Sequence, residues 1–157
     1  AQGVLPLLGY NFSAKNIARM QKAFRFTLSL AVGFSLLCVL VFEIFAPQIV
    51  HLFINDTATI EYGAVFLRVM CISTPLMAVA FLMITLFQAA GEGRPALILS
   101  VFRKGLIDIP LMLLMNSLIP LYGLAGVQPV TEGIAMATAF IFYYNFSRRH
   151  KSEVRSA

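Results

Sequence analysis

Charged side chains are scarce in this chain of 157 residues, which has 12 lysines and arginines and 7 aspartates and glutamates. That is 12% charged residues, about half the usual share in a soluble globular domain. Enzyme motifs are missing too: the sequence has no metal-ligand spacing, no nucleophile elbow and no phosphate-binding glycine loop. The two cysteines, Cys38 and Cys71, both lie in apolar runs and are read as small buried thiols. We therefore expect neither an enzyme nor a metal protein.

Long apolar runs take the place of the missing charges, with 59% hydrophobic residues and a mean hydropathy of +0.84. A membrane helix needs about 20 apolar residues, because it rises about 1.5 Å per residue through the hydrocarbon core. Four runs have this length: residues 26–46, 64–90, 96–118 and 124–146. The fold class is therefore predicted to be an all-α integral membrane protein rather than a barrel.

The positions of the basic residues predict the orientation of these spans. Alternate loops carry nine of the twelve lysines and arginines, namely Lys15, Arg19, Lys22, Arg25, Arg94, Arg148, Arg149, Lys151 and Arg155. The other two loops, residues 47–63 and 119–123, carry none. By the positive-inside rule the basic loops are cytoplasmic, as is a tail at residues 147–157. The basic charge is thereby explained as an orientation signal beside anionic lipid, and no nucleic-acid partner is expected.

Residues 1–10 look like the inner end of a further span, and the chain opens on Ala1 rather than methionine. We expect a fragment of a longer protein, whose missing N-terminal part would be a partner of this one. With no linker or composition shift, residues 1–157 are expected to form one transmembrane domain of four complete helices and the end of a fifth.

Five ionisable residues lie inside the predicted spans, where a charge usually faces a cavity or a partner: Arg68, Arg103, Lys104, Asp108 and Glu132. Arg68 lies near the outer end of its helix, so snorkelling to the interface is the simpler explanation. Lys104 and Asp108 are four residues apart on one helix, so they form either a local ion pair or part of a cavity.

Asp108 and Glu132 are predicted to share a level in the membrane. Counting from the inner ends of their spans places them roughly 20 Å and 21 Å from the cytoplasmic face. Two carboxylates at one depth would bind a cation directly or hold a proton, so they are candidates for a coupling site. In the alternative reading, Lys104 neutralises Asp108, and Glu132, close behind Pro129, caps an irregular helix start.

Several motifs in order along the chain resemble one family of membrane exporters. They are Gly3-Val4-Leu5-Pro6-Leu7-Leu8-Gly9-Tyr10-Asn11-Phe12-Ser13-Ala14-Lys15, Ser73-Thr74-Pro75, Phe87-Gln88-Ala89-Ala90-Gly91-Glu92-Gly93-Arg94-Pro95, Arg103 followed by Ile109-Pro110-Leu111, and Tyr122-Gly123-Leu124-Ala125-Gly126-Val127. The chain resembles the multidrug and toxic compound extrusion family over essentially its whole length.

The resemblance implies that the four complete spans are helices nine to twelve of a two-lobed, twelve-helix transporter. Such proteins expel drugs and organic cations, and their two halves rock to alternate access to a central cavity. A sodium ion or a proton would be the coupling ion, with no other cofactor. In some branches an acid on the tenth helix binds the cation, but here that position falls at about Met77, so the chain looks more like the branch with its essential carboxylate on the first helix.

The candidate transport or cation-binding residues are therefore Asp108, Glu132, Lys104, Arg103 and Gln88, and Met77, Phe81 and Met112 are candidates for lining a soft cavity. The methionines and the phenylalanine would equally suit contact with lipid or a neighbouring helix. Two other functions stay open. One is a flippase for a lipid-linked or polysaccharide substrate, which should have a more cationic cavity, and the other is a non-transporting scaffold, which leaves the intramembrane charges unexplained.

Overall fold

Eight helical segments follow one another in the computed structural model, which describes residues 2–119 and 122–154. They are η1 (Gln2–Val4), α1 (Leu5–Ser13), α2 (Ile17–His51), α3 (Thr57–Ala89), α4 (Gly93–Val101), η2 (Phe102–Ile107), α5 (Asp108–Leu118) and α6 (Tyr122–Val154). Within these two ranges no strand occurs, so the all-α prediction is confirmed.

Three of the helices, α2, α3 and α6, are long and apolar enough to cross a membrane. They contain the predicted spans 26–46 and 124–146 entirely and the span 64–90 except for its last residue. The helices are longer than the apolar runs because the basic and polar flanks continue the helical backbone into the interface. The predicted outer loop 47–63 is thereby reduced to residues 52–56, and the predicted tail is helical as far as Val154, with residues 155–157 outside the described part.

The predicted span 96–118 is not a uniform α-helix. Its residues are divided among α4, η2 and α5, which have 9, 6 and 11 residues and follow one another without a break. The middle segment, η2, is a π-helix, in which each N–H bonds five residues back and the turn is wider than in an α-helix. A wide turn in the middle of a span changes the direction of the side chains on either side of it.

Polar caps and one glycine set the helix ends. Asn16 begins α2 by accepting a hydrogen bond from the Arg19 amide at 3.1 Å, and Asp56 begins α3 by accepting from the Thr59 amide at 3.0 Å. After α3, Gly91 adopts a left-handed conformation with φ of +71°, which reverses the chain into α4. These short turns make consecutive helices antiparallel neighbours.

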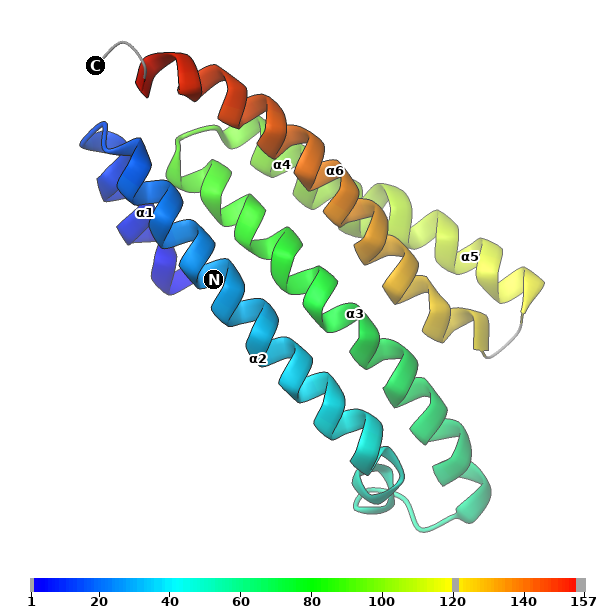
Figure 1. The fold of residues 1–157 in the computed structure, drawn as a ribbon. Helices are drawn as coiled ribbons and strands as arrows, with labels where there is room; N and C mark the ends of the chain where they lie inside the picture. Colours follow the sequence, from blue (N-terminus) through cyan, green and yellow to red (C-terminus); the bar gives the residue numbers. More distant parts are fainter. Residues whose placement is uncertain (1, 120–121, 155–157) are drawn as a thin grey trace.

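Figure 1 shows α2 and α3 side by side along their length, with α6 lying along α3 and α5 beside α6. The α1–α2 turn, the α3–α4 turn and the C-terminal end of α6 gather at one end of the bundle, and the α2–α3 turn lies at the opposite end. Aromatic packing closes the first of these ends: Phe87 is fully buried and meets Phe146 edge-on at 5.8 Å, and Phe24 stacks on Tyr143 at 5.8 Å. The basic loops therefore share the tightly packed end.

Candidate functional site

A buried ion pair joins the π-helical segment to α6. Nε of Arg103, in η2, donates to Oε1 of Glu132, in α6, at 2.9 Å. The two side chains are 4% and 0% exposed, so both charges are buried. Each charge is costly to bury alone, and their direct contact offsets that cost.

The same arginine also contacts α3. The guanidinium carbon of Arg103 lies 4.3 Å from the centroid of the Phe81 ring, within the range of a cation–π interaction. Arg103 therefore connects three elements, η2, α6 and α3, in the middle of the bundle. The Arg103 side chain that makes these contacts belongs to the π-helical turn.

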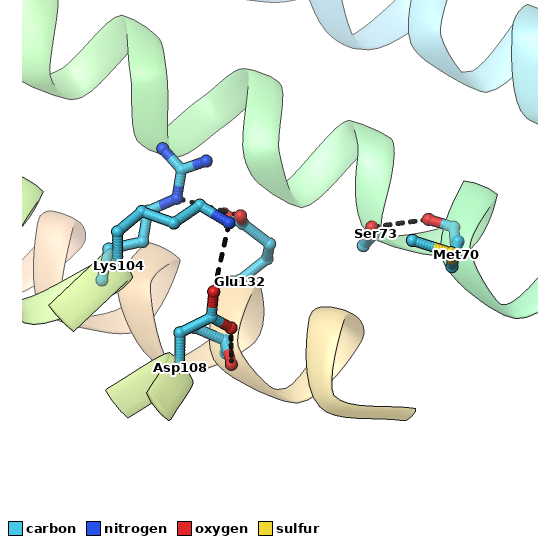
Figure 2. Close-up of polar contacts among 7 residues, drawn as sticks. Met70, Ser73, Lys104, Asp108 and Glu132 are labelled. Atoms are coloured by element: carbon cyan, nitrogen blue, oxygen red, sulfur yellow. Dashed lines mark hydrogen bonds and ion pairs between the residues drawn. The ribbon is translucent and has the colours of Figure 1, made fainter. Parts of the chain in front are cut away.

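A second, more exposed pair lies beside the first (Figure 2). Nζ of Lys104 is 3.3 Å from Oδ2 of Asp108, and the Thr131 hydroxyl donates to Oδ1 of Asp108 at 3.2 Å. The Lys104 and Asp108 side chains are 51% and 25% exposed. Because Thr131 precedes Glu132 in α6, Asp108 and Glu132 lie at one level of the bundle. We call Arg103, Lys104, Asp108, Thr131 and Glu132 the charge cluster.

The charge cluster is balanced, with two basic and two acidic side chains. Each carboxylate contacts a basic residue. The pairing of Asp108 with Lys104 was one of the two predictions for Asp108, whereas the pairing of Glu132 with Arg103 was not predicted. The alternative role for Glu132, capping a helix start, is wrong because α6 begins at Tyr122 and Glu132 lies in its interior. One oxygen of this carboxylate is unsatisfied: Oε2 of Glu132 is buried and has no hydrogen-bond partner.

A cleft of about 880 Å³ lies beside the charge cluster. Its lining comes from η1, α2, α3, α4 and η2, namely Gly3, Thr27, Ala31, Ala78, Phe81, Leu82, Ile84, Thr85, Gln88, Ser100, Arg103 and Lys104. Among the described residues, this lining has two basic side chains and no acidic one. It therefore has an apolar wall from α3 and a basic wall from η2.

The cleft brings together four of the eight candidate residues, Arg103, Lys104, Gln88 and Phe81. Asp108 and Glu132 lie behind the two basic residues and are not part of its lining. Met77 is half-buried in α3 and does not line the cleft, and Met112 lies 53% exposed on α5. No group of three or more histidine, cysteine or acidic side chains suited to a metal occurs among the described residues.

The sequence did not indicate the partner of Arg68. Nε of Arg68 donates to the backbone carbonyl of Glu43 at 3.2 Å and lies 3.6 Å from that residue's Oε2. The side chains are 42% and 36% exposed, so the pair contributes little to stability. Arg68 was placed near the outer end of its span, and Glu43 lies three residues before the outer end of the neighbouring span 26–46. That proximity was the available signal for this contact between α2 and α3.

The chain is similar to known membrane exporters. The MatE family model matches residues 1–114. Multidrug export protein MepA of Staphylococcus aureus is 33% identical over 144 residues, and its counterpart in Staphylococcus saprophyticus is 29% identical over 143. Each alignment covers 91% of this chain and 31% of the relative, so the chain spans about a third of the length of these relatives.

Solved structures agree with the sequence comparison. The Vibrio cholerae MATE transporter VcmN in the bent form superposes with a TM-score of 0.84 at 25% identity, over 94% of this chain and 34% of VcmN. The outward-facing conformation of a multidrug resistance MATE family transporter of the MOP superfamily has a TM-score of 0.86 at 21% identity, over 95% of this chain and 34% of that one. The family model, these relatives and the shared helical fold lead to one conclusion: the chain belongs to the MatE family.

Proposed function

We propose that this chain is part of a secondary active efflux transporter, an antiporter that exports drugs or organic cations in exchange for sodium ions or protons. The relatives named as multidrug export proteins support an export role. The complete transporter would bind its substrate between this bundle and the N-terminal half of the protein. The basic end of the bundle, with the C-terminus, would face the cytoplasm of the cell's plasma (inner) membrane.

The observation that carries the proposal is the charge cluster beside the cleft. A static scaffold has no need of buried charges, whereas transporters use them in substrate and ion pathways. Oε2 of Glu132 has no hydrogen-bond partner, so it is available to a proton or a sodium ion. Either cation would weaken the attraction between Glu132 and Arg103, and Arg103 also lines the cleft. The occupancy of Glu132 would thereby be linked to the state of the substrate cleft.

Alternating access needs helices that change shape as well as charges that change partner. Pro75 and Pro129 lie inside α3 and α6, where each removes a backbone hydrogen bond, and η2 interrupts the α-helical pattern between α4 and α5. Solved transporters of the same fold are described in inward-facing and outward-facing conformations. These three interruptions are the candidate hinges for a similar change here.

The flippase alternative is less well supported by the site. A polyanionic lipid-linked or polysaccharide substrate calls for an excess of positive charge. Arg103 and Lys104 are the only basic residues lining the cleft in the described part of the chain, and each is paired with an acid. The balanced cluster therefore favours the exporter.

The test is efflux of a fluorescent organic cation from drug-sensitive cells that express the complete protein, with the sodium and proton gradients collapsed separately. Efflux that stops with one gradient establishes the antiporter and identifies its coupling ion. Asp108→Asn and Glu132→Gln should each reduce efflux, and unchanged efflux in both variants would remove the carboxylates from the coupling role. Retention of the dye under every gradient would contradict the export function itself.

A further inference from the structure

Four basic side chains around the start of α2 have no partner in the described part of the chain. Elsewhere, Arg68, Arg103 and Lys104 each meet a carboxylate, and Arg148 lies 4.9 Å from the centroid of the Tyr144 ring. Of the nine lysines and arginines whose side chains the structure describes, those without such a contact are Lys15, Arg19, Lys22, Arg25 and Arg94. The first four lie within residues 15–25, so they concentrate positive charge that the described chain does not neutralise.

An exposed face of α2 continues this charge into the apolar part of the span. Arg19, Lys22, Phe26, Leu30 and Gly33 follow one another at intervals of three or four residues, which places them on one side of an α-helix. Arg19 and Lys22 are exposed, Phe26 and Leu30 are 71% and 63% exposed, and a Cβ at Gly33 would meet open space. Only 6% of the most apolar stretch of α2 is buried, against 44% in α3. The described chain therefore leaves this face of α2 uncovered.

The dimensions of this face match one half of a bilayer. Lys22 and Gly33 are eleven residues apart. That separation is roughly 16 Å along an α-helix, which is half of a hydrocarbon core of about 30 Å. Because side chains in a helix lean toward its N-terminus, long basic side chains at positions 19 and 22 favour the headgroup level while Phe26 and Leu30 lie among the acyl chains. Gly33 adds no side chain, so the end of an acyl chain can approach the helix backbone there.

We propose that this face of α2 binds an anionic phospholipid, with the phosphate at Arg19 and Lys22 and one acyl chain along Phe26 and Leu30 as far as Gly33. Basic clusters beside a membrane helix attract anionic headgroups, and the excess positive charge favours phosphatidylglycerol over the zwitterionic phosphatidylcholine. The apolar half of the face makes a lipid the occupant rather than a free phosphate. This inference goes beyond the export role and does not depend on it.

The test measures which lipid lies beside this face in nanodiscs that contain the complete protein. All native cysteines are replaced by serine, and a bimane fluorophore is attached through Phe34→Cys, because Phe34 is 66% exposed and follows Gly33 on α2. Quenching by brominated phosphatidylglycerol is compared with quenching by brominated phosphatidylcholine of the same acyl chains. Phosphatidylglycerol should quench more strongly at equal mole fraction. Lys22→Gln should lower this preference roughly fivefold, as expected for one basic residue at a membrane surface, and Lys22→Arg should retain it.

Two controls separate a defined site from a general attraction of anionic lipid to the basic end of the bundle. Arg94→Gln removes the remaining unpartnered basic residue, which is exposed in α4, and should leave the preference unchanged. Ala137→Cys places the fluorophore at an exposed position of α6, where it should report no preference. Counted from the inner ends of their spans, Phe34 and Ala137 lie at similar depths of roughly 12 Å and 14 Å.

Three results would show a diffuse attraction and overturn the proposal. They are equal quenching by the two lipids at Phe34→Cys, equal losses of preference in Lys22→Gln and Arg94→Gln, and the same preference at Ala137→Cys as at Phe34→Cys. Absence of quenching by either lipid at Phe34→Cys would overturn it in another way. It would show that another part of the complete protein, or a second copy, covers this face of α2.

Discussion

Arg103 and Glu132 show how an intramembrane charge is kept at acceptable cost. The arginine has a carboxylate on one side and an aromatic face on the other, and both partners come from helices remote in sequence. The pair is therefore a tertiary contact, and it holds η2 against α6. Lys104 and Asp108 differ, since their bond is local and partly exposed.

Removing one partner of the buried pair should destabilise the complete protein strongly. Arg103→Met or Glu132→Met leaves the other charge buried without a partner, which costs about 3 kcal/mol or more. The double variant removes both charges and should recover most of that loss. A double-mutant cycle on the thermal unfolding of the complete protein in detergent measures the coupling. Additive single effects would show that the two side chains do not depend on each other.

For single residues, the sequence predicts the depth in the membrane but not the direction in which the side chain points. Depth in the membrane follows from counting residues, and the contact between Asp108 and Thr131 agrees with the shared level calculated for Asp108 and Glu132. The rotation of each helix about its axis does not follow from counting, so the pairing of Glu132 with Arg103 was not predicted. Rotation depends on the packing of α3, η2 and α6 together.

At the scale of elements, the spans were predictable because a bilayer imposes a minimum apolar length on any helix that crosses it. The π-helical turn was not predicted, because Arg103, Lys104 and Gly105 make Phe102–Ile107 an unusual part of the span but do not specify a π-helix. The contacts that Arg103 makes from this turn, with Glu132 and Phe81, are tertiary and do not follow from the local sequence. The helix ends were uncertain by several residues, since capping by Asn16 and Asp56 adds polar turns beyond each apolar run.

The start of α3 should depend on pH through Asp56. Its carboxylate accepts hydrogen bonds from the Thr59 hydroxyl and the Thr59 amide, and these lower the pKa of Asp56 below its ordinary value of 3.8. A lowered pKa means that the cap is fully formed above about pH 4 and is lost as the pH falls through the pKa of the folded state. Amide hydrogen exchange in the first turn of α3 should therefore accelerate, after correction for intrinsic rates, as the pH falls below 3.8. Asp56→Asn keeps a capping oxygen and should remove this pH dependence, whereas an unchanged profile would contradict the assignment.

The first turn of α6 should not tolerate a side chain at position 123. A Cβ on Gly123 would collide with the backbone carbonyl of Met115, and backbone cannot move aside as a flexible side chain can. Gly123→Ala should lower the thermal unfolding temperature of the complete protein by several degrees. Gly126→Ala is the matched control, since nothing lies within 4 Å of a Cβ there. If both substitutions lowered the unfolding temperature equally, the close approach of Gly123 to the Met115 carbonyl would not be the cause of the destabilisation.

At the scale of the whole molecule, the placement of the turns agrees with the charge pattern of the loops. The α1–α2 and α3–α4 turns lie at one end of the bundle with the C-terminal end of α6, and the α2–α3 turn lies at the other (Figure 1). The basic loops thus lie at one end of the bundle, as a consistent topology requires. Tyr122 lies in the predicted outer loop 119–123, and Arg149, His150 and Lys151 lie in the predicted tail 147–157. Their side chains are outside the described set.

The topology predicts which side of the membrane each turn faces. In a complete protein with Cys38 and Cys71 replaced by serine, a single cysteine in place of Phe53 should react with an impermeant maleimide added to intact cells. A cysteine in place of Ser13 should react only after the cells are opened. Phe53 is 83% exposed in the α2–α3 turn, and Ser13 is exposed at the end of α1, so burial does not limit either reaction. The reverse labelling pattern would show that the protein has the opposite orientation in the membrane, and the prediction would be wrong.

The π-helical turn also fixes the length of the helix that contains it. One residue corresponds to about 100° of rotation along an α-helix, so removing a single residue from η2 to restore α-helical pitch would turn α4 against α5 by that angle. Arg103 would then be carried off the face that meets Glu132 while Asp108 stayed beside Thr131. Insertions and deletions in residues 93–118 are therefore more disruptive than substitutions that keep the size of the side chain. Among relatives that keep both ion pairs, this segment should vary in composition but not in length.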